Sequence, residues 1–377
     1  LGDVYKRQTL GGDDGIAVAY ALAILDDDSL SHPRLEFVCT VCEEVGMEGA
    51  TGIDVSMLKG KKLLNMDSEE EGVMLASCAG GCRADVKLPV ERETVSGTKL
   101  TVSLSGLTGG HSGSEIDKGR GNANILMSRL LRDASAPVAI ASIDGGRKDN
   151  AIPRECTAQI IVAPDEAVAV KASIEQAAAE IAEEFKASDP DLKLTVSEET
   201  DCSESAISAK DSARVIALIE ALPNGIIRMS REIDKLVETS LNLGVLKSDD
   251  AAVTLRYAVR SSVGVAKKSL KNQLVCIADA FAAEVTFEGD YPAWEYKKDS
   301  KLREDMVRIF EEMYGKKPTV EAIHAGVECG LLSGKIEGLD CISMGPDMYD
   351  IHTTEERLSI SSAKRSYEYI LRVIACK

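Results

Sequence analysis

The sequence has little positive charge, few aromatic residues and no long apolar run. Its 377 residues include 44 Lys and Arg against 62 Asp and Glu, a net charge of -18 that disfavours nucleic acid or an anionic membrane as a partner. No apolar stretch approaches the roughly 20 residues that a membrane-spanning helix needs. With 44% apolar and 4% aromatic residues, the chain has the composition of a globular protein of two or three domains.

The ten cysteines lack the spacing of a disulfide framework or a zinc finger. Cys39 and Cys42 are three residues apart on a predicted strand, so their side chains point to opposite faces. Cys78 and Cys82 have no matching Cys or His pair further along the chain. We interpret the cysteines as reduced, mostly buried thiols of a cytoplasmic protein. A cysteine-based redox function would require two of them to be close together and reactive.

The order of the predicted elements indicates an α/β domain that is interrupted by a second domain. A helix buried on all sides is predicted over residues 15–25, a buried strand over 34–41 and a short strand over 61–67. From about Cys82, strand patterns alternate with helices over 122–134 and 164–187. After a linker at 287–300 the α/β pattern returns. We therefore predict a mixed sheet flanked by helices, formed by residues 1–80 and 289–377, with an inserted α+β domain over 81–288.

Acidic residues and one histidine lie where strands or glycine-rich turns are predicted to end: Asp13, Glu43, Glu44, Asp67 and His352. Ligands of α/β sheets bind outside the carboxyl ends of the strands, and carboxylates with imidazole are a normal ligand set for zinc. One of the two adjacent glutamates could then bind a metal, while the other takes a proton from a metal-bound water. A solvated strand end is the alternative, and spacing alone does not decide between them.

Eight segments resemble, in the same order, the aminoacyl-histidine (Xaa-His) dipeptidases of the co-catalytic zinc peptidase family. They are TLGGDDGIAVAYALAIL, TVCEEVGMEGA, LLNMDSEEEG, GLTGGHSGSEIDKGRGNAN, DNAIPRE, VETSLNLGVL, AIHAGVECGLL and MGPDMYDIHTTEERLSI. They cover nearly the whole chain from Thr9 onward. The resemblance implies a catalytic α/β domain interrupted by a lid domain that also forms a homodimer. It implies hydrolysis of unblocked dipeptides, preferentially carnosine-like ones with a C-terminal histidine.

The same resemblance implies the roles of the acidic residues. Asp13 would bridge two zinc ions in each subunit of the intact protein, with a cis peptide bond after it. Glu44 and His352 would complete the ligands of one ion, and Asp67 would bind the other. Glu43 would be the general base. Manganese or cobalt are the alternative metals.

Four further residues are candidates for substrate binding. The resemblance implies that His111 binds substrate and stabilises the oxyanion, that Asn150 contacts substrate, and that Arg260 binds the free carboxylate of the dipeptide. Taken alone, they could be a solvated loop histidine, a turn residue and a surface arginine. His324 matches a motif of the family and is expected to contact substrate, although its role is unassigned. His32 is expected to be structural.

One zinc ligand of the resembled family has no counterpart, because none of the four histidines precedes Asp13, where a His-x-Asp segment is expected. The first residues, LGDVYKRQ, lead directly into TLGGDDG. We therefore expect that the natural N-terminal segment is missing, that the chain holds at most one fully coordinated metal, and that its activity is weak or absent. The alternative functions are an amidohydrolase acting on N-acyl amino acids at the same site, or a catalytically dead scaffold that dimerises through the lid.

Overall fold

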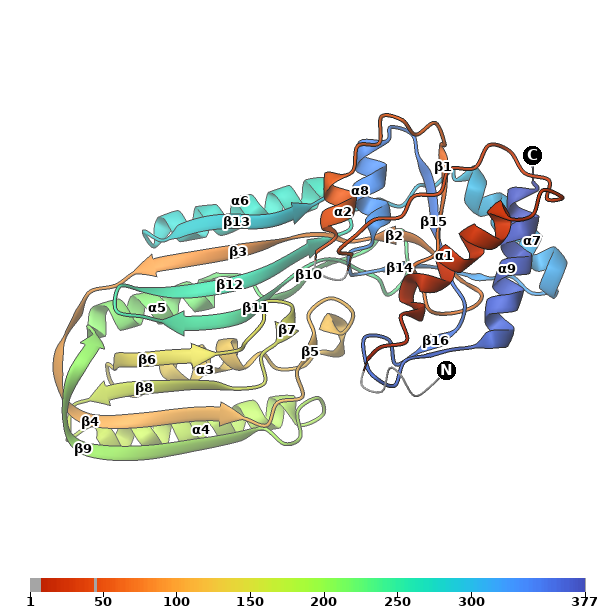
Figure 1. Ribbon diagram of the computed structural model, residues 1–377. Coiled ribbons are helices and arrows are strands. Elements are labelled where there is room, and N and C mark those ends of the chain that lie inside the picture. Colours follow the sequence, from red (N-terminus) through yellow and green to blue (C-terminus); the bar gives the residue numbers. More distant parts are fainter. Residues whose placement is uncertain (1–7, 44–45, 377) are drawn as a thin grey trace. The chain divides into compact units, whose positions relative to one another are not determined.

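The computed structural model describes residues 8–43 and 46–376 (Figure 1). The chain forms two compact units: a split unit made of Leu1–Gly80 and Tyr291–Lys377, and an inserted unit made of Gly81–Asp290. The predicted fold class, an α/β unit interrupted by an α+β unit, is confirmed. Within the described ranges, no helix combines the length and the apolar character that crossing a membrane requires.

The split unit is built on a mixed sheet with the strand order β1-β15-β2-β14 in its described part. Strand β1 runs parallel to β15 and β14 parallel to β2, whereas β15 and β2 are antiparallel. The strands are β1 (Lys62–Asn65), β2 (Val73–Cys78), β14 (Thr319–Ile323) and β15 (Asp340–Ser343), with a separate pair β16 (Met348–Tyr349) and β17 (Arg357–Leu358). The helices are α1 (Gly12–Leu25), α2 (Glu48–Gly52), α7 (Lys301–Tyr314), α8 (Glu328–Lys335) and α9 (Ile360–Ile374).

The core of the split unit forms where α7 and α9, which lie side by side in Figure 1, pack on the sheet. Met74 of β2 and Ile342 of β15 are buried together with Met306 of α7 and Tyr369 of α9. Tyr369 also donates its hydroxyl hydrogen to the Met306 carbonyl at 2.7 Å. Each such buried side chain contributes about 1.5 to 3 kcal/mol. This packing fixes β15, which precedes the segment with His352.

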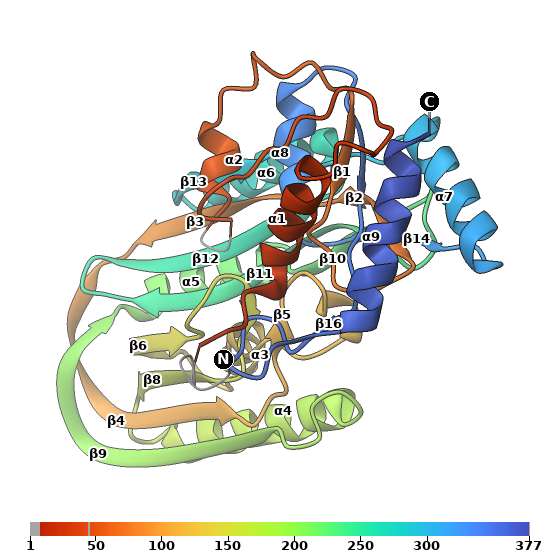
Figure 2. The ribbon, with the colours of Figure 1, turned by 45° about the vertical axis from the view of Figure 1, so that its right-hand side comes forward.

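The inserted unit is a nine-stranded sheet with helices on one face (Figures 1 and 2). The strand order is β13-β3-β12-β11-β6-β8-β4-β9, and β10 also pairs with β11. These strands are β3 (Gly80–Pro89), β4 (Arg92–Ser105), β6 (Ala139–Gly145), β8 (Cys156–Val162), β9 (Lys193–Ile207), β10 (Gly225–Met229), β11 (Val237–Ser248), β12 (Ala252–Ser261) and β13 (Glu284–Tyr291). The helices are α3 (Ala123–Arg132), α4 (Ala167–Phe185), α5 (Ala209–Ala221), α6 (Gly264–Ala280) and the 3-10 helix η1 (Ile116–Lys118). A separate pair joins β5 (Gly110–His111) and β7 (Ala151–Ile152).

The predicted strand over residues 34–41 is wrong. This segment forms no strand, and Phe37 and Val41 are 41% and 69% exposed. Its β-branched pattern finds no neighbouring strand in the described part of the chain, so no ladder of hydrogen bonds forms. The Val41 carbonyl instead accepts the backbone N–H of Gly49 in α2.

Helix α1 is present, but the expectation that it is buried on all sides is wrong. The buried apolar side chains of this helix are those of Tyr20 and Ile24. Leu22 and Leu25 are 63% and 64% exposed. The segment is almost uniformly apolar, so its sequence does not mark which face packs. The linker predicted over residues 287–300 is also partly wrong, because β13 extends to Tyr291.

Candidate active site

Asp13 and His352, two predicted metal ligands from opposite ends of the chain, lie close together in the split unit. His352 Nε2 is 3.1 Å from Asp13 Oδ2, and the Asp13 side chain is only 7% exposed. Asp13 lies in the first turn of α1, and His352 follows β16. The peptide bond between Asp13 and Asp14 is cis, as the resemblance implied. The metal-binding roles of Asp13 and His352 stay predictions.

Glu356, which the sequence analysis missed, holds the backbone beside Asp13. Its Oε2 accepts the N–H of Gly11 at 2.9 Å, and its Oε1 accepts the N–H of Asp13 at 3.1 Å. Burial opposes ionisation of Glu356, but these N–H groups outweigh it, so the pKa of Glu356 is lowered. The spacing His-x-x-x-Glu from His352 to Glu356 was the available signal.

Two carboxyl groups of the split unit have strongly raised pKa values. Burial raises the pKa of Asp14 to about 7, and the negative charges of Asp13, Glu328 and Glu43 contribute further. Burial raises the pKa of Asp67 to about 8, and Glu43, Asp14 and Asp13 again contribute. Partly buried like charges repel one another unless a cation or a proton neutralises them.

Asp13 and His352 offer a carboxylate oxygen and an imidazole nitrogen, which are ligand types that zinc binds. Asp14 Oδ1 is buried without a hydrogen-bond partner in the described structure. The described residues contain no group of three or more His, Cys, Asp and Glu side chains that could hold a metal ion. The predicted ligand Glu44 lies outside the described residues. Asp14 was missed as a site residue, although the Asp13–Asp14 doublet carried a signal.

Glu43 and His324 also belong to the split unit. The Glu43 carbonyl accepts the N–H of Met47 at 2.9 Å, which forms the turn before α2. Burial is the larger cause of the raised pKa values of Asp14 and Asp67, and the charge of Glu43 contributes to both. His324 directly follows β14 and is 5% exposed. The predicted roles of Glu43 and His324 remain untested, and His32 is exposed, with Nδ1 2.7 Å from the Pro33 carbonyl oxygen.

In the inserted unit, the pairing of β5 with β7 brings His111 and Asn150 together. His111 pairs with Ala151, and the N–H of Ser112 donates to the Asn150 carbonyl at 2.9 Å. Asn242 of β11 donates its amide to the Ala151 carbonyl at 2.9 Å. The loop with Asn150 is therefore tied both to the segment with His111 and to the main sheet.

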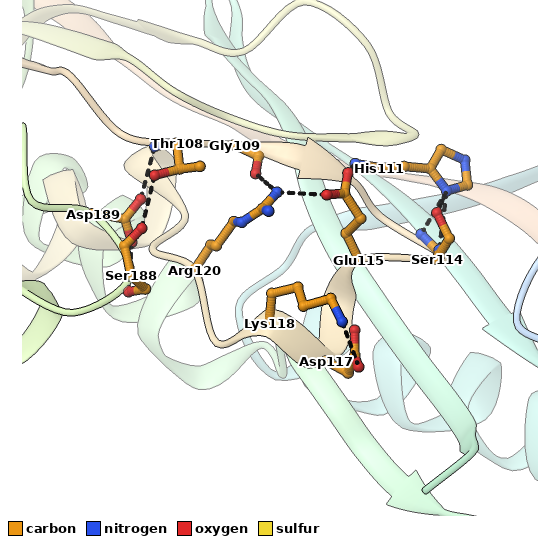
Figure 3. Close-up of polar contacts among 11 residues, drawn as sticks. Thr108, Gly109, His111, Ser114, Glu115, Asp117, Lys118, Arg120, Ser188 and Asp189 are labelled. Carbon is orange, nitrogen blue, oxygen red and sulfur yellow. Dashed lines mark hydrogen bonds and ion pairs between the residues drawn. The ribbon is translucent and has the colours of Figure 1, made fainter. Parts of the chain in front are cut away.

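The ring of His111 is ordered by its own loop (Figure 3). Its Nδ1 accepts the backbone N–H groups of Gly113 at 3.2 Å and Ser114 at 3.1 Å. Burial lowers the pKa of His111, the positive charge of Arg260 lowers it further, and Glu115 opposes these effects. The histidine is therefore biased toward its neutral form.

Arg260 is the penultimate residue of β12, where it pairs with Ser240 of β11. It is partly buried, and its charge acts on His111. His111 thus neighbours both of the other predicted substrate-binding residues of the inserted unit, Asn150 and Arg260. Their binding of substrate stays a prediction.

The Asp13–His352 pair, with further carboxyl groups in an α/β unit that an α+β unit interrupts, is an arrangement typical of metal-dependent hydrolases. Residues 102–189 match the peptidase dimerisation domain of the M20 peptidases. The chain is 36% identical over 361 residues to the cytosol non-specific dipeptidase of Escherichia coli (strain K12), covering 95% of this chain and 74% of that protein. This chain therefore belongs to the M20 family of metallopeptidases.

A solved structure supports the same assignment. The crystal structure of aminoacylhistidine dipeptidase from Vibrio alginolyticus matches with a TM-score of 0.89 and 33% sequence identity. The match covers 97% of this chain and 75% of that protein. The predicted family, fold and hydrolase class are confirmed by these similarities.

Proposed function

We propose that this protein hydrolyses unblocked dipeptides, with preference for a C-terminal histidine. The observation that carries the proposal is the carboxylate cluster of the split unit, where Asp13 lies beside His352 and the pKa values of Asp14 and Asp67 are raised. The similarity to two dipeptidases supports this substrate class. The relatives differ in their names, non-specific dipeptidase and aminoacylhistidine dipeptidase, so the preference at the C-terminal position needs direct measurement.

Zinc is the proposed cofactor, with two ions per subunit where the ligand set is complete. Asp13 would bridge them, Glu44 and His352 would bind one ion, and Asp67 would bind the other. Bound zinc would supply an acidified water and polarise the scissile carbonyl. The raised pKa values of Asp14 and Asp67 support this proposal, because burial and the neighbouring negative charges oppose ionisation and a bound cation would favour it.

The protein's own residues would then move the proton and bind the substrate. Glu43 would take a proton from the attacking water and transfer it to the leaving nitrogen, which breaks the peptide bond. The ring of His111 would donate a hydrogen bond to the oxyanion. Arg260 would bind the substrate carboxylate through its guanidinium, and Asn150 and His324 would contact the rest of the dipeptide.

The inserted unit is the proposed lid and dimerisation domain. Strand β10 exposes a short apolar row, in which Ile226, Ile227 and Met229 are 40%, 41% and 42% exposed. Exposed apolar residues on an open strand mark an association surface. We propose a homodimer formed through this unit, in a cytoplasmic protein.

A substrate panel tests the proposed function. It compares Xaa-His dipeptides, including carnosine, with dipeptides of other C-terminal residues, and with the same dipeptides acetylated at the amine. The zinc bound per chain is measured on the same samples. We expect turnover of free dipeptides to exceed that of acetylated ones, and His to be preferred at the C-terminus. Faster turnover of N-acetyl amino acids than of dipeptides would instead assign an N-acyl amino acid amidohydrolase.

A further inference from the structure

Nδ1 of His111 faces two groups that can only donate hydrogen bonds. The backbone N–H groups of Gly113 and Ser114 point at it, and Ser114 Oγ lies 3.2 Å away. A backbone N–H has no lone pair, so Nδ1 must present its own lone pair to both. A proton on Nδ1 would clash with these donors. In the neutral ring, the proton therefore resides on Nε2.

An ion pair between Glu115 and Arg120 holds the backbone of His111 in place within the same loop. Glu115 Oε2 accepts the His111 N–H at 2.8 Å, and Glu115 Oε1 lies 2.9 Å from Arg120 Nη1. Arg120 Nη1 also donates to the Gly109 carbonyl, so its guanidinium joins both sides of the loop (Figure 3). Gly110 has a φ of +142°, and a Cβ there would lie 2.3 Å from Arg120 Nη1. Another residue at this position would be strained by this φ and would displace the Arg120 guanidinium.

The ends of the loop are tied to a buried acid. Asp189 is 1% exposed, and its two carboxylate oxygens accept the N–H groups of Thr108 and Gly121, each at 2.8 Å. Both ends of the loop are therefore hydrogen-bonded to one carboxylate. This arrangement limits the freedom of the segment between Thr108 and Gly121.

We propose that the loop from Thr108 to Gly121 locks His111 as the neutral Nε2–H tautomer, with Glu115 and Arg120 as its positioning residues. The inference deepens the proposed function, because it makes Nε2–H a preformed donor to the substrate and excludes His111 as the general base. Glu115 and Arg260 are the charged groups that act on this ring. Burial and Arg260 favour the uncharged state, which agrees with the contacts of Nδ1.

The tautomer is measured directly by NMR on the protein with ¹⁵N-labelled histidine. The chain contains only four histidines, so comparison with His111→Gln assigns the His111 signals. We expect a protonated Nε2 and an unprotonated Nδ1 at neutral pH. A protonated Nδ1, or a shift averaged between the two tautomers, would overturn the proposal. This result does not depend on turnover, whereas full dipeptide turnover by His111→Gln would refute only the proposed role of His111 in catalysis.

The positioning role is tested with Glu115→Ala and the size-conserving Glu115→Gln. Glu184→Ala is the matched control, because Glu184 forms a comparable exposed pair with Arg129 on the same unit. We expect both Glu115 variants to lower kcat by about 10- to 100-fold with a smaller effect on KM, since misplacement of a catalytic group slows the chemical step. Their His111 signals should show a mixture of tautomers. Parent-like kcat and tautomer in Glu115→Gln would remove Glu115 from the positioning role, even if Glu115→Ala fails to fold.

Discussion

Replacing Asp67 with Asn should stabilise the metal-free protein at pH 8 and weaken its response to metal. Asp67 is partly buried, and the negative charges of Glu43, Asp14 and Asp13 act on its carboxyl group. In the folded protein Asp67 keeps a proton that the unfolded chain releases near its ordinary pKa of 3.8. The folded state therefore binds more protons between pH 4 and pH 8, and stability falls as the pH rises through this window.

The size of this effect follows from the pKa of Asp67. Raising it from 3.8 to about 8 corresponds to roughly 6 kcal/mol of folding stability that is present below pH 4 and lost by pH 8. Asp14 shares the same repulsion, so part of this loss remains when Asp67 alone is replaced. We therefore expect Asp67→Asn to be more stable than the parent by at least about 2 kcal/mol at pH 8 without metal, by a smaller margin at pH 5, and similar to it only below pH 4.

Urea unfolding at several pH values measures the free energy of unfolding. Samples with chelator give the stability of the metal-free protein, and samples with zinc give the response to metal. Zinc should stabilise the parent more than Asp67→Asn, because a cation binds the folded carboxylates only. Asp54→Asn is the control, since Asp54 is exposed and its pKa is lowered by the Ser56 N–H. If Asp67→Asn without metal has the same pH dependence as the parent, the pKa of Asp67 is not raised in the folded protein.

Three further outcomes are expected of the metal-loaded enzyme. Glu43→Gln should retain zinc and lower kcat by about 10²- to 10⁴-fold in dipeptide assays, and unchanged turnover would remove Glu43 as the base. His111→Ala should lower kcat by about 10²- to 10³-fold without loss of zinc, and a fall in zinc content would make His111 a ligand. The double variant Ile226→Lys and Ile227→Lys should be monomeric by analytical ultracentrifugation. In that experiment Val168→Lys, at a 77% exposed position on α4, should stay dimeric, and a dimeric double variant would move the interface away from β10.

The strands that were predicted correctly have neighbouring strands with the same alternation of buried and exposed residues. In β4, the alternating residues Leu100, Val102 and Leu104 are fully buried, and their partners on β8 alternate in the same way. Such an alternating pattern identifies a strand correctly when the neighbouring strand offers apolar side chains on the same face. Residues 34–41 have a similar β-branched pattern, but a strand also needs an adjacent strand, which the segment's own sequence does not contain.

The site was predicted from motifs rather than from burial, and this explains what was missed. The resemblance named Asp13 and His352, and the structure brings them to 3.1 Å. It did not name Asp14 or Glu356, whose importance arises from burial and from contacts with the backbone. The ring contacts of His111 likewise depend on the exact loop conformation. None of these features has a signature in composition or periodicity.

Glu356 provides the last prediction, because it supports Asp13 without belonging to the predicted ligand set. Its two oxygens each accept a backbone N–H, from Gly11 and from Asp13. In Glu356→Gln one oxygen becomes an NH₂ group, which would face an N–H and leave that donor without an acceptor. Losing a hydrogen bond to a charged group weakens a structure by about 1.5 to 3 kcal/mol.

We expect Glu356→Gln to loosen the Gly11–Asp13 backbone and to lower zinc affinity by about 10- to 100-fold, as replacement of the partners that orient metal ligands does. Competition with a chelator measures this affinity without any substrate. Glu355→Gln is the matched control, because Glu355 is the exposed neighbour in the same segment. Equal zinc affinity of the two variants would mean that the backbone contacts of Glu356 do not orient Asp13. A loss confined to Glu356→Gln would show that the site depends on a carboxylate that need not touch the metal.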